Sequence, residues 1–264
     1  MAQFNANLGP LRFSFEWRLT LLTLTLIPLL LSLGFWQLER ADEKRLLAQR
    51  YQERAGLPPL SAQELQDLLN TTPRERWFEL IADRSIFVDG RIDPDRYVLI
   101  DNQTRNGQFG YDVVVFVETN TLWVPVNLGW MAGDPARRTL PQPRLRDGSR
   151  QVSGRVYLPS SAPYMLVDPA PVTSLPSVVQ RLQTDMIDAD ALFDSRRQLL
   201  PVEIRIKGND PLALQADWPV VNQSPAKHTG YAVQWFTMCA VLLLAFIFGS
   251  SNLWSLVRRG STAP

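Results

Sequence analysis

Two apolar segments of membrane-spanning length lie near the ends of the chain, and they constrain its fold more than any other feature. Trp17–Trp36 reads WRLTLLTLTLIPLLLSLGFW, and Tyr231–Gly249 reads YAVQWFTMCAVLLLAFIFG. A helix of about 20 residues is long enough to cross a hydrocarbon core of about 30 Å. Both segments reach that length, and Arg18 is their single charged residue. The sequence therefore predicts a membrane protein with two transmembrane helices.

The alternative for the first segment is a cleaved signal peptide. The triplet SLG at Ser32–Gly34 loosely matches a small-residue cleavage site. The apolar run is long for a signal peptide, however, and the bulky side chains of Phe35 and Trp36 follow at once. These features favour a retained membrane anchor.

Short basic flanks indicate the orientation of the two spans. Arg12 and Arg18 lie at the start of the first span, and Arg258 and Arg259 follow the second. Basic residues favour the cytoplasmic side of a membrane, so both termini are expected there and the long middle segment outside. The predicted parts are a cytoplasmic N-terminus at 1–16, transmembrane helices at 17–36 and 228–250, an extracytoplasmic domain at 37–227 and a cytoplasmic C-terminus at 251–264.

The segment between the spans reads mainly as short β-strands. Its β-branched and aromatic runs are bounded by Gly, Asn, Asp and Pro, and they are RSIFVDGRI, RYVLID, YDVVVFVET, LWVPVNLGWM, RQVSGRVYL and VEIRIKG. The turn-length gap at Glu118–Thr121 predicts an antiparallel hairpin. We therefore expect a mostly antiparallel, β-rich α+β domain, shaped as a small barrel or sandwich and flanked by the two transmembrane helices.

Helices are expected at three places in this domain. The charged run after the first span predicts that its helix continues outward to about Gly56. Ser61 and Glu64 form a capping box, which predicts a second helix over Ser61–Leu69. A third, short helix is expected at about Asp185–Arg196.

The chain has few side chains suited to nucleophilic catalysis or to metal binding. The single histidine, His228, lies at the membrane boundary, and the single cysteine, Cys239, lies within the second span. Nucleophilic catalysis needs a histidine beside the nucleophile, and zinc or copper sites need several histidines or cysteines. The 27 basic and 26 acidic residues create no strong field for nucleic acid. The sequence therefore favours a protein that is not an enzyme and binds no nucleic acid.

His228 is the one candidate metal ligand. A neutral imidazole serves as an axial ligand of haem iron, and one histidine suffices because the porphyrin supplies four nitrogens. If a helix begins near His228, then Tyr231 and Trp235 follow on the same face. The alternative is an interfacial histidine beside an aromatic belt. Spacing alone leaves both interpretations open.

The exit of the first span carries Trp36, Gln37 and Arg40 at the same predicted membrane boundary. Arg40 can pair with a haem propionate, or it can bind a lipid phosphate as a snorkelling side chain. The candidate cofactor site therefore consists of Trp36, Gln37, Arg40, His228, Tyr231 and Trp235, with His228 as the ligand to haem iron.

Five segments resemble, in order, those of one known family. They are LGFWQLERADEK, VDGRIDPDRYVLIDNQTRNGQFGYDVVVF, WVPVNLGWM, RQVSGRVYLP and KHTGYAVQWF. Together they make the chain similar, through nearly its whole length, to the Surfeit locus protein 1 family of membrane-anchored cytochrome c oxidase assembly factors. The chain departs from that family at Leu128, where an arginine is usual, so no role of that arginine carries over.

The resemblance implies a bacterial inner-membrane protein with a periplasmic domain that assists the biogenesis of a respiratory-chain oxidase. It implies that haem a is bound and passed to oxidase subunit I, with His228 as the haem ligand and Trp36 and Gln37 matching the family's first junction. The expected partners are subunit I, haem a synthase as a further candidate, and membrane lipid.

Two alternatives stay open. The first is a non-haem scaffold that stabilises oxidase assembly intermediates through its periplasmic domain, with Tyr164 and Trp130 as contact residues, although Trp130 is equally expected to be a core residue. Tyr164 belongs to the Pro-rich segment 159–177, which is expected to be a surface loop or a mobile lid. The second is a membrane enzyme acting on lipid or quinone, which the scarcity of His and Cys disfavours.

Overall fold

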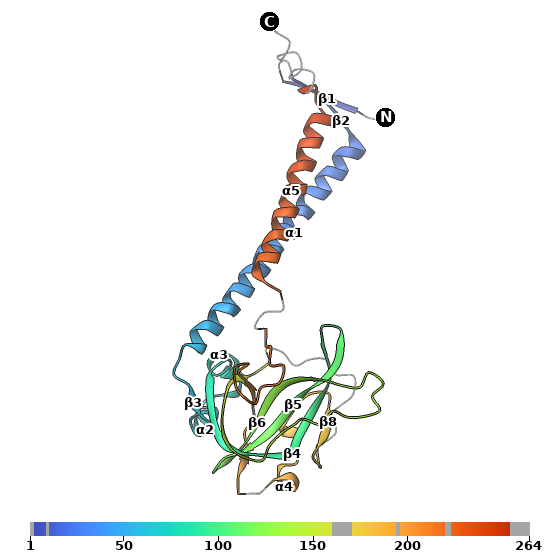
Figure 1. Ribbon diagram of the computed structural model, residues 1–264. Coiled ribbons are helices and arrows are strands. Elements are labelled where there is room, and N and C mark those ends of the chain that lie inside the picture. Colours follow the sequence, from blue (N-terminus) through green and yellow to red (C-terminus); the bar gives the residue numbers. More distant parts are fainter. Residues whose placement is uncertain (1–2, 9–10, 160–170, 194–195, 220–222, 254–264) are drawn as a thin grey trace. The chain divides into compact units, whose positions relative to one another are not determined.

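The computed structural model describes residues 3–8, 11–159, 171–193, 196–219 and 223–253 (Figure 1). The chain forms two compact units. One consists of Met1–Arg50 with Val220–Pro264, and the other of Tyr51–Pro219.

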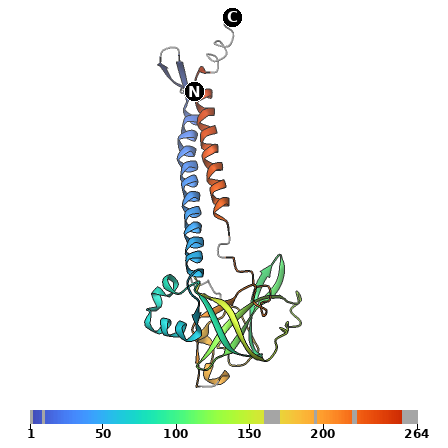
Figure 2. The same cartoon turned by 60° about the vertical axis from the view of Figure 1, so that its left-hand side comes forward.

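The first unit is built on two long helices, α1 (Trp17–Ala55) and α5 (Pro225–Gly249), which lie side by side in Figures 1 and 2. Each is long and apolar enough to cross a membrane, so the chain is a two-span membrane protein. The helix α1 does not end with its apolar part but runs on through the charged segment to Ala55. This confirms the prediction that the first helix continues beyond its apolar segment to about Gly56.

Small side chains lie where the two helices meet. The buried residues of α1 are Thr23, Gly34 and Ala41, and those of α5 are Ala232 and Cys239. Small residues let helix backbones approach closely in a membrane. A Cβ atom added to Gly34 would lie only 2.5 Å from the ring of Phe236, so a larger residue here would force this ring to move.

A hairpin that the sequence did not predict precedes α1. It consists of β1 (Gln3–Leu8) and β2 (Leu11–Glu16), which pair antiparallel. Ser14 N–H donates to the carbonyl of Ser250 at 2.8 Å, just after the end of α5. This bond ties β2 to the residues that follow the second span.

The second unit is a closed five-stranded barrel of β4 (Ser85–Arg105), β5 (Gln108–Glu118), β6 (Leu122–Ala132), β7 (Gly148–Tyr157) and β10 (Glu203–Ile206). Their order is β10-β7-β4-β5-β6, and β10 also pairs in parallel with β6. The first part of β4 pairs with β7 and the rest with β5, so this long strand serves two sides of the barrel. This strand order with a parallel closure is that of an OB-type barrel.

Short elements surround the barrel. They are β3 (Leu60–Ser61), α2 (Ala62–Thr71), the 3₁₀ turn η1 (Arg74–Arg76), α3 (Trp77–Leu80), β8 (Ser177–Val179), the 3₁₀ turn η2 (Thr184–Met186), α4 (Ala189–Leu192) and β9 (Gln198–Leu199). Figure 2 shows the strands of the barrel crossing one another, with α2 and α3 beside them.

Alternate residues of the strands form the core inside the barrel. Val113, Val115 and Val117 of β5 point inward with Val124 and Val126 of β6, and all five are fully buried. The outward-facing side chains Val98, Phe116 and Trp123 are also buried, because Val172, Ile187 and Phe193 pack against them. The described residues of 171–193 and 196–199 therefore form a second layer over the outer face of β4, β5 and β6.

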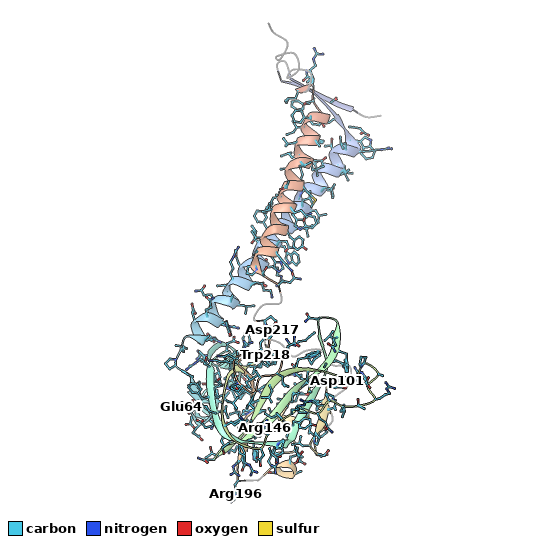
Figure 3. The ribbon with its side chains drawn as sticks, in the orientation of Figure 1. Glu64, Asp101, Arg146, Arg196, Asp217 and Trp218 are labelled. Carbon is cyan, nitrogen blue, oxygen red and sulfur yellow. The ribbon has the colours of Figure 1, made fainter. Side chains whose placement is uncertain are left out.

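The last segment of the domain is fixed by Trp218, which Figure 3 labels beside Asp217. The indole N–H of Trp218 donates to the carbonyl of Ile206 at 2.9 Å. The guanidinium groups of Arg205 and Arg105 lie 4.6 Å and 5.5 Å from its ring centroid. These contacts hold the end of the domain against β10 and β4.

Several predictions from the sequence are confirmed and some are corrected. The Glu118–Thr121 gap does connect an antiparallel hairpin, β5–β6, and Ser61 caps α2 in a capping box with Glu64. The runs expected at residues 84–92 and 96–101 are one bent strand, β4, rather than two strands. The predicted helix at 185–196 is only η2 and α4, and its residues 194–195 lie outside the described part of the chain.

The predicted contact residues of the domain have different outcomes. Trp130 is 7% exposed and its indole N–H donates to the carbonyl of Gln103 at 2.9 Å, so it belongs to the packed interior and not to a docking surface. Tyr164 and most of the 159–177 loop fall within 160–170, outside the described residues.

Candidate functional site

The candidate site begins with a hydrogen bond between the two membrane helices. His228 lies in the first turn of α5, which starts at Pro225, and Gln37 lies in α1 between the buried Gly34 and Ala41. The Nδ1 atom of His228 lies 2.8 Å from Oε1 of Gln37. The two residues that the sequence placed at one membrane depth are therefore in direct contact.

This contact favours one tautomer of the imidazole. The Oε1 atom of Gln37 is an amide oxygen and can only accept, so Nδ1 of His228 carries the proton and donates it. The lone pair of a neutral imidazole then resides on Nε2. A hydrogen bond of this kind is how proteins orient a histidine that binds a metal through its other nitrogen.

A second bond holds the helices together near the same level. The guanidinium of Arg45 donates to Thr229 Oγ1 at 3.1 Å, next to His228 in sequence. Arg45 also pairs with Asp42 at 2.5 Å. Further along α5, Phe236 packs against Gly34 of α1. The imidazole therefore lies between two interhelical contacts, the Arg45–Thr229 bond and the Phe236–Gly34 packing.

The other predicted site residues lie around this pair on the same two helices. The guanidinium of Arg40 lies 5.9 Å from the ring centroid of Trp36 and pairs with Glu43 at 2.6 Å. Trp36 and Tyr231 are 47% and 51% exposed, and Trp235 is partly buried. The structure joins His228 to Gln37 and Arg40 to Trp36, and the side chains of Trp36 and Tyr231 remain about half exposed.

A polar cluster on the outer face of the barrel was missed by the sequence analysis. It consists of Asp112 on β5, Asn127 on β6, and Glu203 and Arg205 on β10. Asn127 is fully buried, and its Nδ2 donates to Glu203 Oε1 at 3.0 Å while its Oδ1 accepts from the N–H of Gly129 at 3.0 Å. Arg205 Nε lies 3.3 Å from the same Glu203 oxygen.

The ionisation of this polar cluster is perturbed by burial. Burial raises the pKa of Asp112, opposed by the charges of Arg105 and Arg205. Burial also raises the pKa of Glu203, opposed by Arg205 and by the bond from Asn127. One signal could have revealed the cluster, because Asp112 and Asn127 interrupt strands that are otherwise apolar on both faces.

Two spanning helices that share a hydrogen-bonded imidazole, with a closed β barrel between them in the sequence, define a membrane-anchored protein with an extramembrane β domain. The model of the SURF1 family matches residues 24–240, which is most of the chain. The chain therefore belongs to the SURF1 family, and membership implies a role in cytochrome c oxidase assembly with oxidase components as partners. A comparison with curated proteins found no match.

Proposed function

We propose that this protein binds haem a and assists its insertion into subunit I of cytochrome c oxidase. The hydrogen bond from His228 to Gln37 is the observation that carries this proposal, because it leaves Nε2 free to bind iron. We further propose that the protein resides in a bacterial inner membrane with both termini in the cytoplasm, as the arginines flanking the spans favour. On this orientation the β domain is periplasmic, and haem a synthase is a further candidate partner.

The residues at the junction fit a haem. When bound, haem a would supply a redox-active iron that can take a histidine side chain as a ligand. His228 would hold the iron, and Gln37 would keep the imidazole in one orientation. Trp36 and Tyr231 offer exposed aromatic surface, which suits a flat apolar ring.

Arg40 could serve a propionate only by exchanging its present partner. Its ion pair with Glu43 is half-exposed on both sides, and exposed pairs contribute only about 0–1 kcal/mol. Such a pair is easily replaced by a propionate carboxylate, which can bind the guanidinium through two parallel hydrogen bonds. A site open to the membrane on one side also suits a carrier, which must release its ligand.

The test is the visible absorption spectrum of the full chain, co-expressed with the enzymes of haem a synthesis and purified in detergent. The proposal expects haem a in the wild type and its loss in His228→Ala, with the β domain still folded by circular dichroism. Gln234→Ala is the matched control, since Gln234 is an exposed polar residue of the same helix. Unchanged haem retention in His228→Ala would refute the proposal.

A second variant tests the role of Gln37. Loss of a hydrogen bond that orients a metal-binding histidine weakens metal affinity by about 10- to 100-fold. Gln37→Leu should therefore weaken haem a binding to that extent in an absorbance titration. If neither the wild type nor its variants bind haem, the scaffold alternative gains support, and the next measurement is co-purification of oxidase subunits with the β domain.

A further inference from the structure

The hairpin that precedes α1 has one apolar and one polar face. Apolar and polar residues alternate along both of its strands, QFNANL in β1 and LRFSFE in β2. Successive residues of a strand lie on opposite faces of the sheet, and residues directly opposite each other on paired strands share a face. The register pairs apolar residues with one another, in the pairs Phe4–Phe15, Ala6–Phe13 and Leu8–Leu11. It pairs the polar residues likewise, in the pairs Gln3–Glu16, Asn5–Ser14 and Asn7–Arg12. All the apolar positions of the hairpin therefore lie on one face.

This apolar face is the one turned towards the membrane helices. The rings of Phe13 and Phe15 are stacked with their centroids 5.7 Å apart, and Phe15 stacks on Phe246 at 6.0 Å. Phe246 belongs to the last turn of α5, which ends at Gly249. The apolar face is thus continuous with the side chains of a spanning helix.

The apolar face needs a further surface to pack on. Phe13 and Phe15 remain partly exposed, whereas Arg12 and Ser14 on the opposite face are exposed. A two-stranded hairpin is at best marginally stable in water unless its apolar face packs against something. The partner of this face must therefore be apolar and must lie at the end of the spans.

The hairpin is held at the ends of both spans, as Figure 1 shows. The strand β2 leads into α1 with no residue between them. On the other side, Ser14 N–H donates to the carbonyl of Ser250 at 2.8 Å, and Asn252 N–H donates to the carbonyl of Arg12 at 3.1 Å. Because the ends of two spanning helices lie at a membrane boundary, the hairpin lies there too.

The backbone of β1 decides between the hydrocarbon core and the headgroup region. Among the described residues β1 pairs with β2 alone, so the backbone groups on its other edge have no strand partner there. Such an edge is not tolerated in hydrocarbon, but water and headgroups can satisfy it.

The neighbouring side chains also fit the headgroup region. Trp17, the first residue of α1, is 53% exposed, and tryptophan is enriched at membrane–water interfaces. Arg12 and Arg18 are exposed, and basic residues at this level are attracted to anionic lipids. An interfacial segment binds through its buried apolar area together with such charge attraction.

We infer that the N-terminal hairpin lies in the interface of the lipid bilayer, with its apolar face on the acyl chains and its polar face towards water. Lipid is the partner of the apolar face, because that face continues the surface of a spanning helix at the membrane boundary. The inference is independent of haem binding at His228. On the orientation proposed above, the hairpin lies in the cytoplasmic leaflet.

The experiment measures the accessibility of spin labels on the full chain, reconstituted into vesicles of phosphatidylethanolamine and phosphatidylglycerol. Each variant carries one cysteine in a Cys239→Ala background, since Cys239 is the single cysteine of the chain. Phe13→Cys reports on the apolar face, and Ser14→Cys is its matched control on the polar face. Oxygen concentrates in lipid and a nickel chelate stays in water, so the ratio of their collision rates in power-saturation EPR distinguishes the two environments.

We expect the oxygen-to-nickel ratio to be severalfold higher for the label at position 13 than for the label at position 14. The register supplies a second pair, in which Ala6→Cys should behave like Phe13→Cys, and Asn5→Cys like Ser14→Cys. Ala6→Cys is a small change, so this pair keeps the test decisive if the label at position 13 disturbs the hairpin.

Two results would overturn the inference. One is equal nickel accessibility within both pairs, which would place both faces of the hairpin in water. The other is a low collision rate of both reagents at positions 6 and 13, which would show that protein covers the apolar face. Dipolar coupling between labels on two chains would then identify that protein as a second copy.

Discussion

Replacing Asn127 by leucine should destabilise the β domain strongly, although the two side chains are similar in size. Asn127 is fully buried, and its amide satisfies Glu203 on one side and the N–H of Gly129 on the other, both at 3.0 Å. A hydrogen bond to a charged group contributes about 1.5–3 kcal/mol, and a buried N–H left without an acceptor costs about 1–3 kcal/mol. We therefore expect Asn127→Leu to lower the free energy of unfolding by about 3–5 kcal/mol.

The assay is thermal unfolding of the purified full chain, followed by tryptophan fluorescence, since Trp123 and Trp130 are buried in the domain. For a domain of this size, about 1 kcal/mol shifts Tm by about 2–4 °C, so a decrease of about 6–20 °C is expected for a loss of about 3–5 kcal/mol. Asn209→Leu, at an exposed position of the same domain, should leave Tm unchanged. A loss of less than about 1 kcal/mol in Asn127→Leu would show that the two bonds do not stabilise the fold, and the reasoning would be wrong.

Two further predictions concern pH and the helix crossing. Burial raises the pKa of Glu203, so the folded domain binds the proton of this carboxyl group more tightly than the unfolded chain does. The protonated group therefore stabilises the fold below about pH 4, and this stabilisation is lost as pH rises through the raised pKa. Glu203→Gln should therefore flatten the decrease in Tm from mildly acidic to neutral pH, and an unchanged slope would contradict the assignment. Gly34→Leu should force α1 and α5 apart at a cost of about 1–3 kcal/mol and expose the buried thiol of Cys239, measured as faster labelling by N-ethylmaleimide. Gly249→Leu, where an added Cβ meets nothing within 4 Å, should label at the wild-type rate, and equal rates in both variants would refute this packing.

The local elements of the fold could be predicted because their signals are local. Apolar length predicts the two spans, and the β-branched runs predict β5, β6 and β7. The capping box of Ser61 and Glu64 predicts the start of α2. Each of these patterns depends on residues close together in sequence.

The closure of the barrel could not be predicted in this way. The parallel pairing of β6 with β10 joins Val126 to Ile204 and Asn127 to Arg205, far apart in the chain. The bend in β4 follows from its pairing with β7 and β5 in turn, which no run of residues within β4 reveals.

The candidate haem site and the polar cluster differ in how far the sequence predicts them. His228 and Gln37 could be placed at one depth because the membrane gives both spans a common axis, although only the structure shows their bond. Glu203 and Arg205 alternate with buried isoleucines, a pattern typical of a solvent-exposed face. Both side chains are nevertheless largely covered, with only 11% of Glu203 and 21% of Arg205 exposed.

The parallel closure of the barrel also bears on how the protein is made. The strand β10, which completes the barrel by joining β7 to β6, is the last strand of the domain, and only residues 207–224 separate it from α5. Because synthesis proceeds from the N-terminus, β4 to β7 emerge first as an open sheet with unpaired edges. Barrel closure therefore waits for a strand that is synthesised only shortly before the second span.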